Sequence, residues 1–147
     1  MRTTILLLVI VQVVLGNKTY SIPNFEANWY KAYEYCLSKD QRLATIESEA
    51  ESDAVIQFVK NSDKYGDRIR FWIGAGDLAQ EGTYTWTSTN KLLKYAIWGK
   101  NEPNNRYGNE HCIELYHRAE IWLWNDHVCE YEFYFICESF TAVCDSN

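Results

Sequence analysis

The sequence predicts an α+β fold in which two amphipathic helices are followed by several short antiparallel strands and one long polar loop. Apolar residues recur at helical spacing between residues 29 and 59, and short aromatic runs follow from residue 71 onward. Residues 87–111 show no sustained periodicity of either kind. A connection of this length in a compact domain usually carries function. We therefore expect one domain with its binding site on that loop.

The first predicted helix begins after Asn28, a residue suited to the N-cap position. Its apolar residues follow the i, i+3, i+4, i+7, i+8 spacing of one buried face: Trp29, Ala32, Tyr33, Cys36 and Leu37. The second helix begins at Ser48, which forms the S-x-x-E pattern of a capping box with Glu51, and it ends near Asn61. The expected apolar face of the second helix consists of Ala54, Val55, Phe58 and Val59.

The strand candidates are short and mostly aromatic. They are residues 19–22, 43–46, 71–74, 84–86, 112–115, 121–124 and 133–137. In the last of these, Phe133, Phe135 and Cys137 alternate as a half-buried strand requires.

The N-terminus has the pattern of a secretory signal peptide. A positive charge at Arg2 precedes an apolar stretch from Ile5 to Leu15, and Gly16 is a small residue at a plausible cleavage site. This stretch is shorter than the roughly 20 residues that span a bilayer. We expect residues 1–16 to be removed, residues 17–138 to form the domain, and residues 139–147 to form a short tail. The protein is thus expected to be secreted, without membrane insertion.

The charge of the chain is acidic, with a formal net value of −6 at pH 7 that becomes −7 when Arg2 is removed. An acidic surface without basic clusters in the sequence argues against nucleic acid and anionic membranes as partners.

Five cysteines follow the signal peptide: Cys36, Cys112, Cys129, Cys137 and Cys144. Secretion makes disulfides the expected state, and the spacing does not match a zinc site. An odd cysteine in a secreted protein indicates an intermolecular bridge or a free thiol. A disulfide-linked homodimer is one of these two outcomes.

The polar loop and the segment behind it are rich in hard oxygen donors. These are the carboxylates of Glu102, Glu110 and Asp126 and the amides of Asn104 and Asn125. Oxygen donors without sulfur or imidazole favour calcium over zinc or copper, and magnesium prefers a tighter octahedron with more water. The spacing is not that of an EF-hand. A solvated polar loop has a similar composition, so composition alone leaves both interpretations open.

The order of these residues resembles the C-type lectin family. Glu102-Pro103-Asn104 precedes Glu110 by the family's interval, Trp124-Asn125-Asp126 precedes Cys129, and Phe71-Trp72-Ile73-Gly74 resembles the family's W-I-G strand. The resemblance covers about residues 20–138.

The resemblance implies a fold with two helices and two small antiparallel sheets, stapled by disulfides Cys36–Cys137 and Cys112–Cys129. It implies a long loop that binds one calcium ion, with a cis peptide before Pro103. The implied ligands of calcium and sugar are Glu102, Asn104, Glu110, Asn125 and Asp126.

In this family, the E-P-N order accompanies sugars with equatorial 3- and 4-hydroxyls, so the resemblance implies a mannose-type ligand. Glu102 would accept a hydrogen bond from a sugar hydroxyl and Asn104 would donate one. Neighbours such as Arg106, Tyr107 and His127 can override the tripeptide. The alternatives are a galactose-type sugar or a protein ligand.

Asp77 and Glu81 match positions of an auxiliary calcium site in some family members. The other positions of that site are Asn105 and His111 here, where carboxylates would be expected. Because calcium affinity tracks ligand charge, we expect a single principal calcium ion.

Catalysis is not expected. A glycosidase needs a carboxyl group with a raised pKa as its acid, whereas a bound cation would keep these carboxylates ionised. The three histidines, His111, His117 and His127, suggest no triad. By analogy with small secreted family members, the expected role is recognition of glycans on cell or microbial surfaces in innate immunity.

Overall fold

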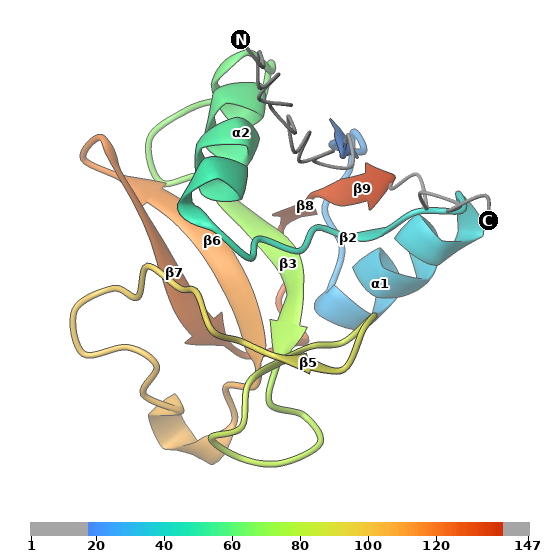
Figure 1. Ribbon diagram of the computed structural model, residues 1–147. Helices are drawn as coiled ribbons and strands as arrows, with labels where there is room; N and C mark the ends of the chain where they lie inside the picture. The colour runs from blue at the N-terminus through green and yellow to red at the C-terminus, as the bar shows by residue number, and fades with distance from the viewer. Residues whose placement is uncertain (1–17, 140–147) are drawn as a thin grey trace, which may run out of the picture.

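Two sheets and two helices make up residues 18–139, the part of the chain that the computed structural model describes (Figure 1). The predicted signal peptide at residues 1–16 and Cys144 lie outside these residues. In chain order the elements are β1 (Thr19–Ser21), α1 (Trp29–Ser38), β2 (Arg42–Leu43), α2 (Glu49–Lys60), β3 (Arg70–Gly76), β4 (Thr85–Trp86), β5 (Lys91–Leu92), the 3₁₀ helix η1 (Arg106–Gly108), β6 (Cys112–Arg118), β7 (Ile121–His127), β8 (Tyr134–Phe135) and β9 (Cys137–Ser139).

The smaller sheet has the strand order β1-β9-β2, and the larger one has the order β5-β4-β3-β6-β7. Neighbouring strands are antiparallel, except that β8 pairs in parallel with β3. Figure 1 shows α1 beside the smaller sheet and α2 above the larger one. The predicted α+β class with two helices and two small sheets is confirmed.

Side-chain caps begin both helices where the sequence predicts. The side chain of Asn28 accepts a hydrogen bond from the backbone N–H of Lys31 at 2.9 Å. Ser48 Oγ accepts from the N–H of Glu51 at 3.2 Å. The carboxylate of Glu51 binds the N–H of Glu47 at 2.8 Å, one residue before the position that a capping box would use.

The buried helix faces are narrower than the sequence predicts. On α1 the buried residues are Trp29, Ala32 and Cys36, whereas Leu37 is 48% exposed, so its predicted burial is wrong. One residue turns a helix by about 100°, which carries Leu37 off the stripe that Cys36 occupies. On α2 the same geometry exposes Ala54. The residues buried instead are Ser52, Val55 and Val59, and Phe58 is partly buried.

Two apolar clusters form the core. One lies between α2 and the larger sheet, where Trp86, Trp124 and Ile113 are fully buried. The other surrounds α1 and contains all four bonded cysteines. Disulfides Cys36–Cys137 and Cys112–Cys129 are present, as the family resemblance implies. They tie the first helix to the last strand and the start of β6 to the segment after β7.

Three predictions of local structure are wrong in detail. Of residues 43–46, predicted as a strand, only Leu43 lies in one, β2. Residues 87–111, expected to be a connection without helix or strand because they show no periodicity, contain β5 and η1. Residues 133–137 do not form one half-buried strand, because Ile136 separates β8 from β9 and is itself buried. The Ile136 carbonyl accepts a hydrogen bond from Ala44 N, and its N–H donates to Trp72 O. The segment therefore passes between the two sheets and is buried on both sides.

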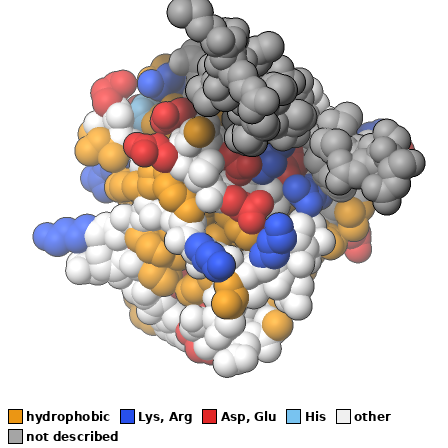
Figure 2. All heavy atoms as spheres, viewed as in Figure 1, with side chains coloured by type: hydrophobic (Ala, Val, Ile, Leu, Met, Phe, Trp, Pro, Cys, Tyr) orange, Lys and Arg blue, Asp and Glu red, His pale blue; other side chains and the backbone are white. Residues whose placement is uncertain are grey.

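The surface is mixed in charge on the face that carries α2 and β5. Figure 2 shows acidic and basic side chains interspersed with apolar ones there, so neither sign of charge covers that face. Within residues 18–139, no helix is long and apolar enough to cross a membrane.

Candidate functional site

Backbone hydrogen bonds join the polar loop to the middle of β7. Trp124 O accepts a hydrogen bond from Gly99 N at 2.9 Å, and the N–H of Trp124 donates to Ile97 O at 2.7 Å. The peptide between Glu102 and Pro103 is cis, as the family resemblance implies. These contacts place the side chains at 102–110 beside those at 125 and 126.

Asp126 is the buried centre of the site. Its two carboxylate oxygens accept hydrogen bonds from the backbone N–H groups of Asn104 at 3.0 Å and Asn105 at 2.7 Å. Tyr84 Oη donates to the same oxygen as Asn105 N, Oδ2, at 3.2 Å. Because Asp126 is fully buried and holds two consecutive amides of the loop, its position sets the course of the chain after Pro103.

Glu110 closes the other end of the loop. Its carboxylate accepts a hydrogen bond from the backbone N–H of Arg106 at 3.0 Å, and its own N–H donates to Asn105 Oδ1 at 3.0 Å. Two of the predicted site carboxylates, those of Asp126 and Glu110, thus organise the loop backbone. The side chain of Asn104 is exposed, and no described residue forms a hydrogen bond with it.

Glu114, on β6, is a member of the site that the sequence analysis missed. Its side chain is 1% exposed and accepts from Arg70 Nη1 at 2.9 Å and from Asn125 Nδ2 at 2.9 Å. The contact with Asn125 follows from strand register, because the two residues are paired on β6 and β7. An acidic residue within the otherwise apolar Cys112–Leu115 run was the available signal.

The carboxylates of the site oppose one another's ionisation. Burial, a hydrogen bond with Asp126 and repulsion from Asp126, Glu110 and Glu114 raise the pKa of Glu102 to about 7. Burial likewise raises the pKa of Glu110. Glu102 Oε2 is buried without a hydrogen-bond partner. A divalent cation would relieve both the repulsion and this unsatisfied oxygen, so the residues fit the calcium ion that the family resemblance implies.

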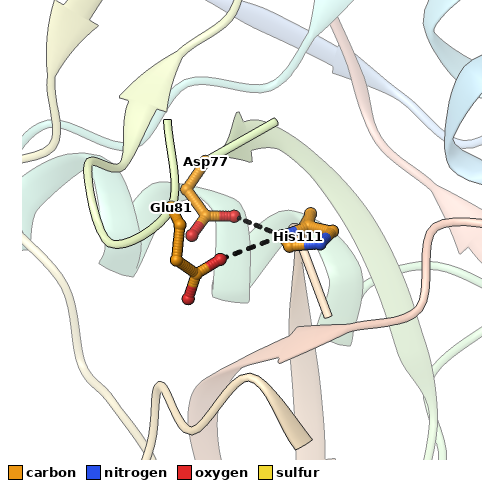
Figure 3. Close-up of side chains that lie close together, drawn as sticks. All are labelled: Asp77, Glu81 and His111. Carbon is orange, nitrogen blue, oxygen red and sulfur yellow. Dashed lines mark hydrogen bonds and ion pairs between the residues drawn. The ribbon is translucent and has the colours of Figure 1, made fainter. Parts of the chain in front are cut away.

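A second cluster lies beside the loop, at the residues matched to the auxiliary calcium site. Asp77 follows β3, Glu81 lies in the loop before β4, and His111 precedes β6 (Figure 3). His111 Nδ1 is 3.0 Å from Asp77 Oδ1 and 3.4 Å from Glu81 Oε2. The three ligand atoms lie within 4.8 Å of one another.

This cluster lacks the character of a calcium site. The imidazole lies against both carboxylates and can donate an N–H to Asp77 directly. Asn105, the neutral residue at another auxiliary position, already uses its side-chain oxygen on Glu110 N. Calcium prefers charged oxygen ligands, so an imidazole and a neutral amide at two positions make this cluster a poor calcium site.

The comparison with known proteins decides the family. Residues 26–139 match the family model of the lectin C-type domain. The chain belongs to the C-type lectin family. C-type lectin mosGCTL-7 of Aedes aegypti is 41% identical over 142 residues, which cover 94% of this chain and 94% of that protein. Salivary C-type lectin 1 of Aedes albopictus is 38% identical, over 81% of this chain and 80% of that protein.

The fold also matches solved C-type lectin domains. The C-type lectin domain of murine dendritic cell inhibitory receptor 2, determined in complex with an N-glycan, is similar with a TM-score of 0.70 and 27% identity. The match covers 84% of this chain and 91% of that one. The chain is therefore a C-type lectin carbohydrate-recognition domain, in a family of binding proteins that often depend on calcium. This confirms the expectation that it is not an enzyme.

Proposed function

We propose that this C-type lectin is a secreted, calcium-dependent protein that binds mannose-type glycans. The observation that carries the proposal is the buried, unpartnered Glu102 Oε2, crowded by Asp126 and Glu110 next to the exposed amide of Asn104. Carboxylates arranged in this way attract a divalent cation, and the exposed amide beside them is free to donate to a ligand.

The proposed calcium ligands are Glu102, Asn104, Glu110, Asn125 and Asp126. When bound, calcium supplies coordination for two neighbouring hydroxyl oxygens of a sugar. The protein orients that sugar, because Glu102 accepts a hydrogen bond from one hydroxyl and Asn104 donates one. Asn125 has a fixed amide orientation, since its Nδ2 donates to Glu114 and leaves its Oδ1 free.

The relatives support secretion and glycan binding. A salivary lectin is among them, which agrees with the signal peptide expected at residues 1–16. A solved relative carries an N-glycan. Recognition of microbial or self glycans in innate immunity is the role we propose by analogy with other small secreted lectins.

Retention of the purified protein on mannose-agarose tests the proposal. We expect retention in calcium, release by EDTA or free mannose, and little release by free galactose. Asn104→Asp is expected to abolish or alter retention, because it replaces the N–H donor with an acceptor. Asn90→Asp is the matched control, since it makes the same chemical change at an exposed residue of the turn between β4 and β5, away from the segments that hold the proposed ligands.

Two results would redirect the proposal. Elution by galactose in place of mannose would keep the calcium site and assign a galactose-type sugar. Retention that EDTA does not reverse would favour the other alternative, a C-type lectin-like domain with a protein ligand.

Cys144 supports a further part of the proposal, a disulfide-linked homodimer. Both disulfides among residues 18–139 use the other four cysteines, which leaves Cys144 as the odd one. Pairing two domains would raise avidity for a surface that displays many glycans. Identical migration on reducing and non-reducing gels would exclude this dimer.

A further inference from the structure

A cleft of about 500 Å³ opens beside the proposed calcium site and shares the side chains of Glu102 and Asn125 with it. It runs along one face of β6, on which every second residue lies: Glu114, Tyr116 and Arg118. From Glu114 to Arg118 this face is about 13 Å long at the usual rise of a strand, which is longer than one sugar ring. A glycan held at the calcium site therefore has room to continue into the cleft.

Arginine is concentrated in this cleft. The chain has six arginines, of which Arg2 lies outside the described residues and Arg42 binds Glu138 on the smaller sheet at 2.7 Å. The remaining four all line the cleft: Arg68, Arg70, Arg106 and Arg118. The positive charge of these four side chains is opposite in sign to the net charge of −6 that the whole chain carries.

The acidic residues of the cleft are already committed to other contacts. Glu114 is buried and accepts hydrogen bonds from Arg70 and Asn125. Glu102 is a proposed calcium ligand, so bound calcium would offset its charge. With calcium in place, the field that a ligand meets in the cleft is positive.

Several of these guanidinium groups have N–H donors that form no ion pair with a described carboxylate. Among residues 18–139, no carboxylate lies within 4.0 Å of Arg106 or Arg118. Arg68 is 79% exposed, and its ion-pair partner is the adjacent Asp67 at 3.7 Å. Arg70 uses Nη1 on Glu114 and is thereby held in place, with Nε and Nη2 left over. Guanidinium groups bind planar and tetrahedral oxyanions through paired N–H donors.

We propose that this arginine cleft is a second subsite, which binds an anionic group on the sugar residue next to the one at the calcium site. The preferred ligand is then an acidic glycan, and a carboxylate, sulfate or phosphate provides the shared chemistry. This inference rests on the proposed lectin function. A glycan is favoured over a nucleic acid because the cleft ends at the sugar site and shares residues with it.

Calorimetric titration with matched disaccharides tests the subsite. The probes are mannobiose and mannobiose carrying one sulfate, one phosphate or one carboxylate on its reducing-end residue, each in excess calcium at low ionic strength. We expect at least one charged form to bind about fivefold more tightly than the neutral form. The advantage should vanish at about 1 M salt, where the Debye length is about 3 Å. Comparison among the charged forms identifies the anion.

The double variant Arg68→Gln/Arg118→Gln is expected to bind charged and neutral disaccharides alike. These two arginines are exposed and, unlike Arg70 and Arg106, form no hydrogen bond with Glu114 or the calcium loop. Lys31→Gln/Lys60→Gln is the matched control, because it also removes two positive charges, from exposed positions on α1 and α2, and should keep the preference.

The outcomes separate this inference from the proposed function. Equal, calcium-dependent binding of charged and neutral disaccharides by the wild-type protein would overturn the subsite and leave the lectin proposal standing. Failure of every disaccharide to bind in calcium would overturn both. Binding of charged forms that EDTA leaves unchanged, or equally tight binding of an oligonucleotide, would overturn the subsite in favour of a general polyanion surface.

Discussion

Glu114 shows how a residue that need not touch the ligand can set the geometry of the site. Its buried carboxylate lies between the guanidinium of Arg70 and the amide of Asn125. Because that carboxylate can only accept, it fixes Asn125 with Nδ2 toward β6 and Oδ1 left for a cation. Partners of this kind outside the ligand set usually tune metal affinity strongly.

Replacing Glu114 with glutamine is therefore expected to weaken calcium binding by about tenfold or more. A glutamine keeps the shape of the side chain but can present an N–H to Arg70 and to Asn125, so the amide of Asn125 is free to flip. Calorimetric titration with calcium measures the loss, and Glu49→Gln on the exposed start of α2 is the control. Unchanged affinity in Glu114→Gln would show that Asn125 needs no such orientation.

His111 and Asn105 lead to a second prediction at this scale. If they are what prevents an auxiliary calcium site, the double variant Asn105→Asp/His111→Asp should gain one. The change adds two carboxylates beside Asp77 and Glu81 and removes the imidazole that lies between them. We expect one calcium per chain for the wild-type protein and two for the variant. Two sites of similar affinity in the wild-type protein would defeat the single-calcium proposal.

At the scale of elements, the sequence predicts the longer helices and strands, which have a recognisable pattern of apolar residues. Both helices, β3, β6 and β7 are found where the patterns place them, because the helices and β7 bury one face at a regular period and the other two strands contain runs of consecutive buried residues. The two-residue strand β5 and the break at Ile136 are not predictable in this way. Such short segments have no period, and tertiary pairing decides their conformation.

The disulfide Cys112–Cys129 belongs to this scale, since it joins the start of β6 to the chain that leaves β7. Its two cysteines are 17 residues apart, so removing it as Cys112→Ala/Cys129→Ala should cost about 3 kcal/mol in the free energy of unfolding. Because Asp126 and Glu110 lie next to the bridge, calcium affinity should fall as well. Denaturant unfolding and calcium titration measure the two effects.

Removal of Cys36–Cys137 is the comparison. Its cysteines are 101 residues apart, which predicts a larger loss of about 4.7 kcal/mol. It ties α1 to β9, away from the calcium loop, so calcium affinity measured under folding conditions should change less. Equal loss of calcium affinity in both variants would mean that Cys112–Cys129 has no special role at the site.

At the scale of the whole molecule, the site exists only where distant segments meet. Tyr84, Asn104 and Asp126 come from three parts of the chain and are joined by hydrogen bonds. The oxygen-rich composition indicated which residues could bind a cation, but only the resemblance to a family ordered them into one site. The arginine cleft was not predicted, because Arg68, Arg106 and Arg118 are scattered in the sequence and meet only after β3 and β6 pair.

Calcium should therefore stabilise the entire fold. A ligand at 100 times its dissociation constant adds about 2.7 kcal/mol, which corresponds to a rise in Tm of about 10 °C for a domain of this size. Thermal melts in calcium and in EDTA measure the shift. Magnesium should give a smaller one, because it holds its water and prefers a tighter geometry. No shift in calcium would contradict the calcium site.

Glu102→Gln separates calcium binding from charge repulsion in the same experiment. The folded pKa of Glu102 is about 7 against an ordinary value of 4.5, so its ionisation destabilises the calcium-free fold as the pH rises from 4.5 toward 7. In EDTA at pH 8, the variant should consequently melt at a higher temperature than the wild-type protein. The rise in Tm that calcium produces should be mostly lost in this variant, because one proposed calcium ligand has been removed. A variant that melts at a lower temperature than the wild-type protein in EDTA would show that repulsion from its acidic neighbours does not destabilise the fold at Glu102.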